Sequence, residues 1–153
     1  MGIDRFEDLH GWQEARKLTR LIYSLTKKPD FRKDYNLRNQ SQAAAVSSMG
    51  NIAEAHGRFS FEEKRSFYEI SHGSIEELQS HLYVALDQEY ISKEDFQEAY
   101  NALARLGGLL KGLLITSAGR SVPDAATVEK AASLSSRFLL RYARTFVPSY
   151  AVC

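Results

Sequence analysis

The sequence predicts an all-α protein: an antiparallel, up-down-up-down four-helix bundle with an additional C-terminal amphipathic helix. Apolar residues recur at steps of three and four through long segments, which is the spacing of one helix face. The period-two alternation typical of strands is nowhere sustained. The three prolines, Pro29, Pro123 and Pro148, stand between or beyond the periodic segments. Because the connections are short, successive helices must run antiparallel.

The first two helices are expected at about residues 8–28 and 35–56. The first has an apolar stripe with cations largely off it, and Pro29 follows its end. Asp34 is a suitable N-cap for the second. The middle of the second helix consists mostly of small residues, so we expect it at the tightest contact of the bundle. Gly57 is expected to end it in a left-handed conformation.

The third and fourth helices are expected at about residues 61–89 and 92–117. Ser60 and Glu63 have the spacing of a capping box, in which each side chain accepts a hydrogen bond from the other residue's backbone N–H. Ile70 is placed on the apolar stripe of the third helix. The fourth helix begins with an acidic turn, which the helix dipole favours, and is rich in leucine.

Two regions follow from this pattern: a four-helix bundle at residues 1–119, and a linker with a C-terminal helix and tail at residues 120–153. In the last helix, Arg137, Arg141 and Arg144 fall on a different face from the apolar residues. A four-helix bundle already closes its core. This helix is therefore expected to cover an outer groove, a neighbouring subunit or another partner.

The composition fits a soluble protein that stays in the cell. At 153 residues the chain has the length of one domain, and 44% hydrophobic with 25% charged residues is ordinary for a globular protein. No segment approaches the roughly 18–20 continuous apolar residues of a membrane helix, and residues 1–8 have no export signal. Cys153 has no disulfide partner. We therefore expect a cytoplasmic protein without a membrane partner.

The formal net charge of +1 hides an uneven distribution. Residues 1–60 have ten Lys/Arg and seven Asp/Glu, residues 61–100 have three and ten, and residues 101–153 have seven and two. The chain is thus basic, then acidic, then basic. This order favours self-complementary packing or a local basic surface over a uniformly cationic protein.

No pattern of side chains predicts catalysis or metal binding. Glu69 and His72 have the Glu-x-x-His spacing that di-iron bundles use to place two ligands on one face. Such a site needs a second copy of the motif, and Glu77 to His81 is one residue too long. There is no phosphate-binding glycine loop and no nucleophile–base pattern. We expect no catalytic residue, no metal and no cofactor.

Several segments carry a family resemblance. They are the opening Phe-Glu-Asp-Leu-His-Gly-Trp-Gln-Glu-Ala at residues 6–15, Asn-Ile-Ala-Glu-Ala-His-Gly-Arg at 51–58, and matching stretches at 73–79 and 85–92. In order and spacing, residues 6–118 resemble the bacterial four helix bundle protein family. That family includes proteins encoded in intervening sequences of 23S rRNA genes and the accessory variability protein of diversity-generating retroelements.

The resemblance implies a homopentamer with a central channel. Retroelement members of the family are strongly basic and bind nucleic acid and a reverse transcriptase to support mutagenic reverse transcription. The rRNA-associated members have no settled activity. The partners implied for this chain are copies of itself, RNA or DNA, and a reverse transcriptase.

The signature segment places polar residues at the end of the second helix. Glu54 and Arg58 are four apart and can pair, with Asn51 beside them. One interpretation is structural: these residues cap the helix or bond to the third helix through Glu76 or Glu77. The other is a contact to a ligand or RNA.

A larger group of cations lies in the first helix, the following connection and the start of the second helix. They form either an ordinary solvated face or a patch that contacts phosphates, multiplied by assembly if the protein is a ring. The tail arginines could add charge beside aromatic side chains that stack on bases. The group comprises Arg16, Lys17, Arg20, Lys27, Lys28, Arg32, Lys33 and Arg38.

Two functional hypotheses follow. The first is a non-enzymatic, oligomeric accessory protein that binds RNA, DNA or a nucleic-acid enzyme through basic surfaces. The second is a protein–protein scaffold without nucleic-acid affinity, assembled through the acidic third helix and its basic neighbours.

Overall fold

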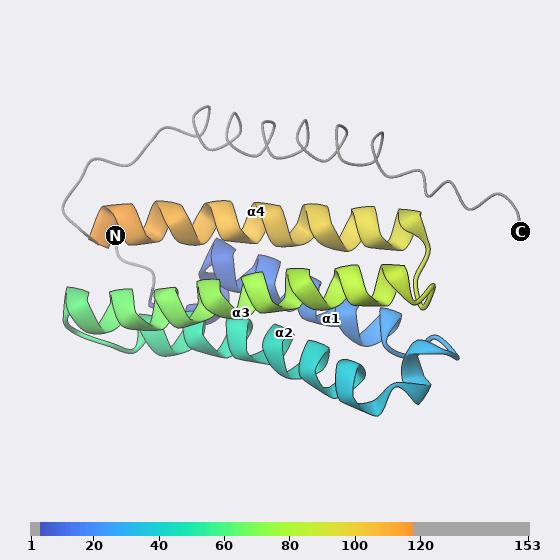
Figure 1. The fold of residues 1–153 in the computed structure, drawn as a ribbon. Helices are drawn as coiled ribbons and strands as arrows, with labels where there is room; N and C mark the ends of the chain where they lie inside the picture. Colours follow the sequence, from blue (N-terminus) through green and yellow to red (C-terminus); the bar gives the residue numbers. More distant parts are fainter. Residues whose placement is uncertain (1–3, 118–153) are drawn as a thin grey trace, which may run out of the picture.

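The computed structural model describes residues 4–117, with side chains up to Leu114, and it confirms the predicted four-helix bundle (Figure 1). Successive helices run antiparallel, so the chain goes up, down, up and down. Two short 3-10 helices, η1 and η2, precede α1 and α2. The bounds are η1 Phe6–Asp8, α1 His10–Leu25, η2 Phe31–Lys33, α2 Tyr35–His56, α3 Phe61–Asp87 and α4 Lys93–Ser117.

The four helices form a ring of neighbours. α1 packs against α2 and α4, and α3 packs against the same two helices, so α1 and α3 lie on a diagonal. Figure 1 shows this arrangement, with α4 above, α2 below, α3 in front and α1 behind. The most extensive contact is between α2 and α3. As a consequence, α1 and α3 present their outer faces on opposite sides of the molecule.

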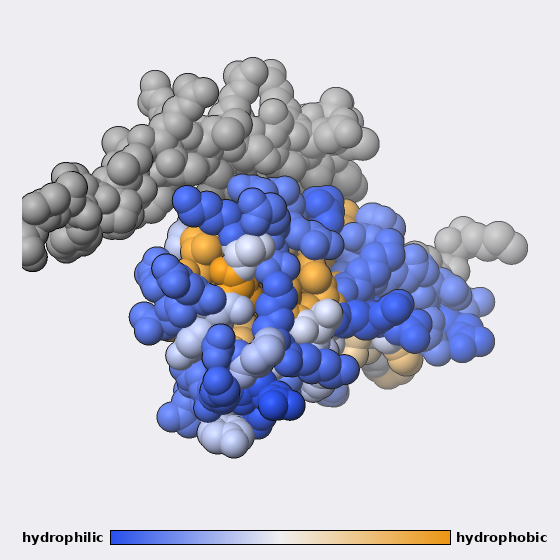
Figure 2. All heavy atoms as spheres, turned by 90° about the vertical axis from the view of Figure 1, so that its right-hand side faces the viewer, coloured by the Kyte–Doolittle hydropathy of each residue, from blue (hydrophilic) through white to orange (hydrophobic). Residues whose placement is uncertain are grey.

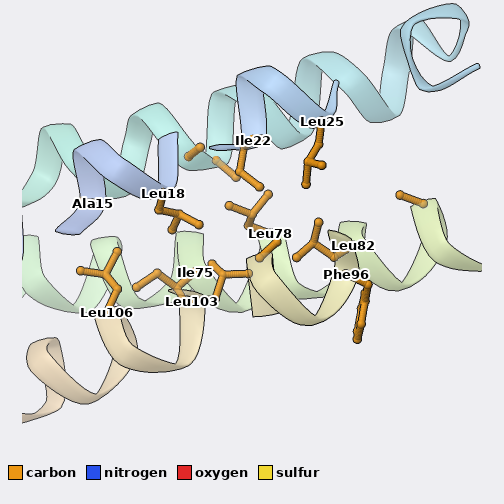
Figure 3. Close-up of a cluster of buried hydrophobic side chains, with 14 of the residues drawn as sticks. Ala15, Leu18, Ile22, Leu25, Ile75, Leu78, Leu82, Phe96, Leu103 and Leu106 are labelled. Atoms are coloured by element: carbon orange, nitrogen blue, oxygen red, sulfur yellow. The ribbon is translucent and has the colours of Figure 1, made fainter. Parts of the chain in front are cut away.

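The core is built from the apolar faces of all four helices, with the larger side chains mainly from α1, α3 and α4. Leu18 from α1, Leu78 from α3 and Leu103 from α4 point toward one another between the helices (Figure 3). All three are buried. The stripe at three- and four-residue spacing is what brings these side chains to one face of each helix.

Small polar residues join α2 to α3. The Ser71 hydroxyl donates to the backbone carbonyl of Ser48 at 2.9 Å and lies 3.1 Å from the Ser48 hydroxyl. One turn away, the Ser47 and Ser74 hydroxyls are 2.9 Å apart. A serine side chain reaches the backbone of the facing helix only where two helices approach closely. The small residues of α2 therefore lie where the sequence predicted, in the most extensive contact of the bundle.

The capping predictions are confirmed. The Ser60 hydroxyl accepts a hydrogen bond from the Glu63 backbone N–H at 3.2 Å, and the Glu63 carboxylate accepts one from the Ser60 N–H. Asp34 accepts from the backbone N–H of Leu37 at 3.0 Å. These contacts satisfy backbone donors that a helix leaves unpaired in its first turn.

The prediction of a left-handed conformation at Gly57 is wrong. Gly57 has a φ of −74°, and its N–H continues the right-handed turn to the carbonyls of α2. The left-handed residue is Glu89, with a φ of 58°. There, the Tyr90 N–H donates to the Ala85 carbonyl at 2.8 Å, the closing hydrogen bond of a Schellman motif. The α3–α4 connection thus needs a positive φ, whereas the α2–α3 connection does not.

Two further expectations are corrected. The first helix spans His10–Leu25 rather than about residues 8–28, because residues 6–8 form a 3-10 turn and the chain turns again after Leu25. Ile70 was expected in the core but is 51% exposed. Ser71 and Ser74 occupy the side of α3 that faces α2, so Ile70 is rotated out of the contact. The predicted C-terminal helix lies outside the described residues.

Candidate nucleic-acid interface

The structure brings the candidate cations to one side of the bundle. Arg16, Lys17 and Arg20 lie on α1, and Lys27 and Lys28 lie in the turn after it. Arg32 and Lys33 lie in η2, and Arg38 lies in the first turn of α2. Six of the eight are exposed, while Lys28 and Arg38 are partly buried. Arg137, Arg141 and Arg144 lie outside the described residues. The eight placed residues are Arg16, Lys17, Arg20, Lys27, Lys28, Arg32, Lys33 and Arg38.

Three of these cations are paired with carboxylates. Lys17 donates to Glu14 at 2.6 Å, and Lys33 donates to Asp30 at 2.8 Å. Because both lysines are exposed, these pairs contribute little to stability. A phosphate that binds either lysine has to compete with the neighbouring carboxylate.

The third pair, between Lys28 and Asp95, joins the end of α1 to the start of α4. Asp95 also accepts from the backbone N–H and hydroxyl of Ser92, both at 2.9 Å, and so completes a second capping box. The hydrogen bond from Lys28 lowers the pKa of Asp95 below its ordinary value, and the bonds from Ser92 act in the same direction. The Lys28 ammonium is thus paired with Asp95, and a phosphate that binds it has to compete with that carboxylate.

The other five cations have no carboxylate partner within residues 4–117. The Arg16 guanidinium lies 5.7 Å from the centre of the Trp12 ring, and that of Arg38 lies 5.0 Å from the centre of the Tyr35 ring. Arg38 also donates to the carbonyl of Arg32 at 3.4 Å, which ties η2 to α2. The remaining three unpaired cations are Arg20, Lys27 and Arg32.

Local structure explains why these cations point outward. The buried side chain of Phe31 anchors the α1–α2 connection to the core and stacks on Tyr90, with ring centres 5.7 Å apart. With Phe31 turned inward, its neighbour Arg32 is left exposed. On α1, Arg16 and Arg20 are one turn apart on the side opposite the buried stripe. The cations therefore line the outside of α1 and one end of the bundle.

The same end of the bundle also has an acidic side. Asp87, Glu89 and Glu94 are exposed in or near the α3–α4 connection. Figure 2 looks onto this end and shows hydrophilic residues over most of it, with some hydrophobic residues between them. The cations belong to the α1–α2 connection and the carboxylates to the α3–α4 connection. Any phosphate contact is thus favoured only on the α1–α2 side.

The signature residues at the end of α2 contact one another. Arg58 donates to the Glu54 carboxylate, and its guanidinium lies 4.7 Å from the centre of the Phe67 ring of α3. Asn51 donates to the backbone carbonyl of Ser47 at 2.7 Å. The link from this segment to α3 is thus a cation–π contact with Phe67.

Glu76 and Glu77 lie elsewhere on α3. The Glu76 carboxylate is 3.7 Å from His72, and the Glu77 carboxylate is 3.9 Å from His81, each within the same helix. Neither contacts Arg58. Glu69 accepts from Arg65 at 2.8 Å. Among residues 4–117 there is no group of three or more His, Cys, Asp or Glu side chains that could hold a metal ion.

Within the described part of the chain, none of the helices combines the length and apolar character needed to cross a bilayer. The fold and surface define a helical bundle with one basic side and one acidic side. Residues 7–112 match the sequence model of the 23S rRNA-intervening sequence protein family. The chain belongs to that family, which is not a known class of enzyme. None of the curated proteins compared with the chain matches it.

Proposed function

We propose that this protein is a non-enzymatic, cytoplasmic accessory protein that self-associates and binds RNA or DNA through the cations of the α1–α2 connection. The observation that carries the proposal is the pair Lys27 and Arg32, which are exposed and have no carboxylate partner among residues 4–117. Cations of this kind neutralise phosphates and release counterions. Tyr35, which is exposed beside Arg38, offers a ring on which a base can stack.

Family membership supports a role connected with RNA. The motif resemblance supports assembly as a pentamer and a nucleic-acid enzyme, such as a reverse transcriptase, as a further partner. The near-neutral net charge limits where nucleic acid can bind, since attraction must come from one side of the bundle. Contacts to phosphates alone predict binding with little preference for sequence.

Reversing two of the unpaired charges tests the nucleic-acid part of the proposal. The double variant Lys27→Glu/Arg32→Glu should bind labelled single-stranded RNA about tenfold or more weakly at low salt, because each exposed charge contact is worth up to about 1 kcal/mol. Fluorescence anisotropy measures the loss. The matched control is Arg105→Glu/Lys111→Glu, which reverses two exposed charges on α4 away from the α1–α2 connection and should leave affinity within about twofold.

Equal weakening by the control and the double variant would mean that the RNA responds to overall charge rather than to this surface. If the wild-type protein binds no RNA at low salt, the second candidate function applies. That candidate is a protein–protein scaffold without nucleic-acid affinity. It is favoured by one specific observation: residues 66–92 contain five exposed Asp/Glu and no Lys or Arg.

A further inference from the structure

The outer side of α2 and α3 has an apolar patch that the bundle leaves uncovered. It consists of Val46 and Gly50 of α2 and Ile70 and Gly73 of α3, all exposed. Val46 is 42% exposed and Ile70 is 51% exposed. Ser48 and Ser71 lie opposite each other and set the register of the two helices. Along the bundle axis, each of the four patch residues lies within about 3 Å of this contact.

The two glycines of this patch have no role in the packing of the bundle. A Cβ atom added at Gly50 or Gly73 would meet no atom within 4 Å. Alanine would also be the better helix former at both positions. Glycine in a helix allows another backbone to approach closely, and here the space for that approach lies outside the bundle. Residues 39–53 contain no charged side chain, which is typical of the centre of a protein interface.

Charge identifies the kind of surface that fits the patch. Glu76 and Glu77 are exposed on α3 close to Gly73, and residues 66–92 contain no Lys or Arg. These carboxylates repel phosphates, so nucleic acid is not the expected occupant. The fitting partner is a basic protein surface.

The chain itself has such a surface on the opposite side of the bundle. Residues 15–29 of α1 and the following turn contain five Lys/Arg and no Asp/Glu. Arg16 and Arg20 lie on the outer face of α1, with Tyr23 also exposed. Arginine and tyrosine are enriched in protein interfaces. The two surfaces belong to α1 and α3, which are diagonal in the bundle, so one copy cannot pair them within itself.

The two surfaces also lie at the same height. The Thr19 hydroxyl of α1 donates to the Ala45 carbonyl of α2 at 3.2 Å, and Ser48 of α2 meets Ser71 of α3. Counting along the helices from these two contacts puts Arg20 within about 2 Å of the height of Glu76. Copies placed side by side therefore match basic to acidic without sliding along the bundle axis.

We propose that Arg16 and Arg20 of one copy dock on the α2–α3 patch and the carboxylates beside it in a second copy. This inference rests on the self-association included in the proposed function and names the surfaces that produce it. The contact is head-to-tail, because each copy offers two different faces. Lys27 and Arg32, at the end of the bundle, stay outside the contact and remain free for phosphates.

Charge reversal on each surface, and on both together, tests the assignment. Arg16→Glu/Arg20→Glu and Glu76→Lys/Glu77→Lys each place like charges across the contact, and light scattering should show that each loses the wild-type assembled mass. The quadruple variant restores opposite charges and should recover that mass. All four side chains are exposed, so circular dichroism should show folded helices in every variant.

A second pair of substitutions tests the apolar centre without changing charge. Val46→Ser/Ile70→Ser should weaken self-association about tenfold or more, since both side chains lose the burial that a partner provides. Val84, which is exposed further along α3, serves as the control. Val84→Ser should leave the dissociation constant of self-association within about twofold.

The outcomes separate this inference from the proposed function. An assembled wild type that is unaffected by both double charge reversals would overturn the inference alone. So would a quadruple variant that stays dissociated. A monomeric wild type would remove self-association itself and the inference with it. RNA binding, measured separately with Lys27→Glu/Arg32→Glu, would be affected by neither result.

Discussion

Leu78→Ala is expected to lower the free energy of unfolding by about 3 kcal/mol, within the range of about 2–5 kcal/mol seen for buried leucines. Leu78 is completely buried, between residues of α1 and α4 (Figure 3). Truncation removes apolar surface and leaves a cavity, because three packed helices cannot collapse around one missing side chain. Urea unfolding followed by circular dichroism measures the change.

Leu86→Ala is the matched control for this prediction. Leu86 lies two turns further along α3 and is only partly buried. Its truncation should have a clearly smaller effect, because the remaining side chains and solvent fill the space. Both variants have to be compared at one protein concentration, since self-association adds to apparent stability. Equal losses would show that the core does not centre on Leu78.

Ser48→Leu is the second substitution with a large expected effect, about 2–4 kcal/mol of unfolding free energy. Ser48 is 1% exposed, and its hydroxyl lies 3.1 Å from that of Ser71. A leucine side chain has no room there unless α2 and α3 move apart. It also removes the hydroxyl contact between the two helices. The same urea titration gives the magnitude.

Ser48→Ala separates crowding from the lost hydroxyl. The Ser71 hydroxyl keeps its bond to the backbone carbonyl of residue 48, so no buried donor is left without an acceptor. We expect a loss of about 1 kcal/mol or less. A leucine variant as stable as the alanine variant would contradict the close approach of α2 and α3.

The fold could be predicted from the sequence because several local signals agree. The apolar stripes, the capping box at Ser60 and the N-cap at Asp34 all indicate the same helices. A prediction that rested on a single local signal was wrong. A glycine at position 57 indicated a left-handed end, but the left-handed residue is Glu89, which has no such signature. Local propensity does not show which connection has to turn sharply.

The serine contacts between α2 and α3 explain the misplaced Ile70. Periodicity assigns apolar residues to the core and polar residues to the surface. In α3, however, Ser71 is completely buried because it bonds to α2, and Ile70 is left outside. The spacing of Ser71 and Ser74, three apart and opposite serines on α2, is the signal that could have shown this. The periodicity of one helix does not show which of its polar residues form hydrogen bonds to another helix.

The candidate interface could be predicted only in part. The sequence identified the cations, and their location on α1 and its connection follows from the helix boundaries. It could not show that Lys28 is bonded to Asp95, 67 residues away, or that Arg20 and Arg32 have no such partner in the described chain. Contacts between distant segments decide which charges are free. The opposite placement of the basic and acidic sides likewise depends on how the helices pack.

The salt dependence of RNA binding shows whether the unpaired cations of the α1–α2 connection bind phosphates. If Lys27 and Arg32 each neutralise one phosphate of a single strand, the logarithm of the association constant should fall with the logarithm of salt concentration with a slope of about −1.4 per protomer. Fluorescence anisotropy with labelled single-stranded RNA, at several salt concentrations, gives this slope for the wild-type protein. A linear fall of about that steepness is the predicted result. Absence of binding at low salt, or binding that does not change with salt, would contradict phosphate binding by these cations.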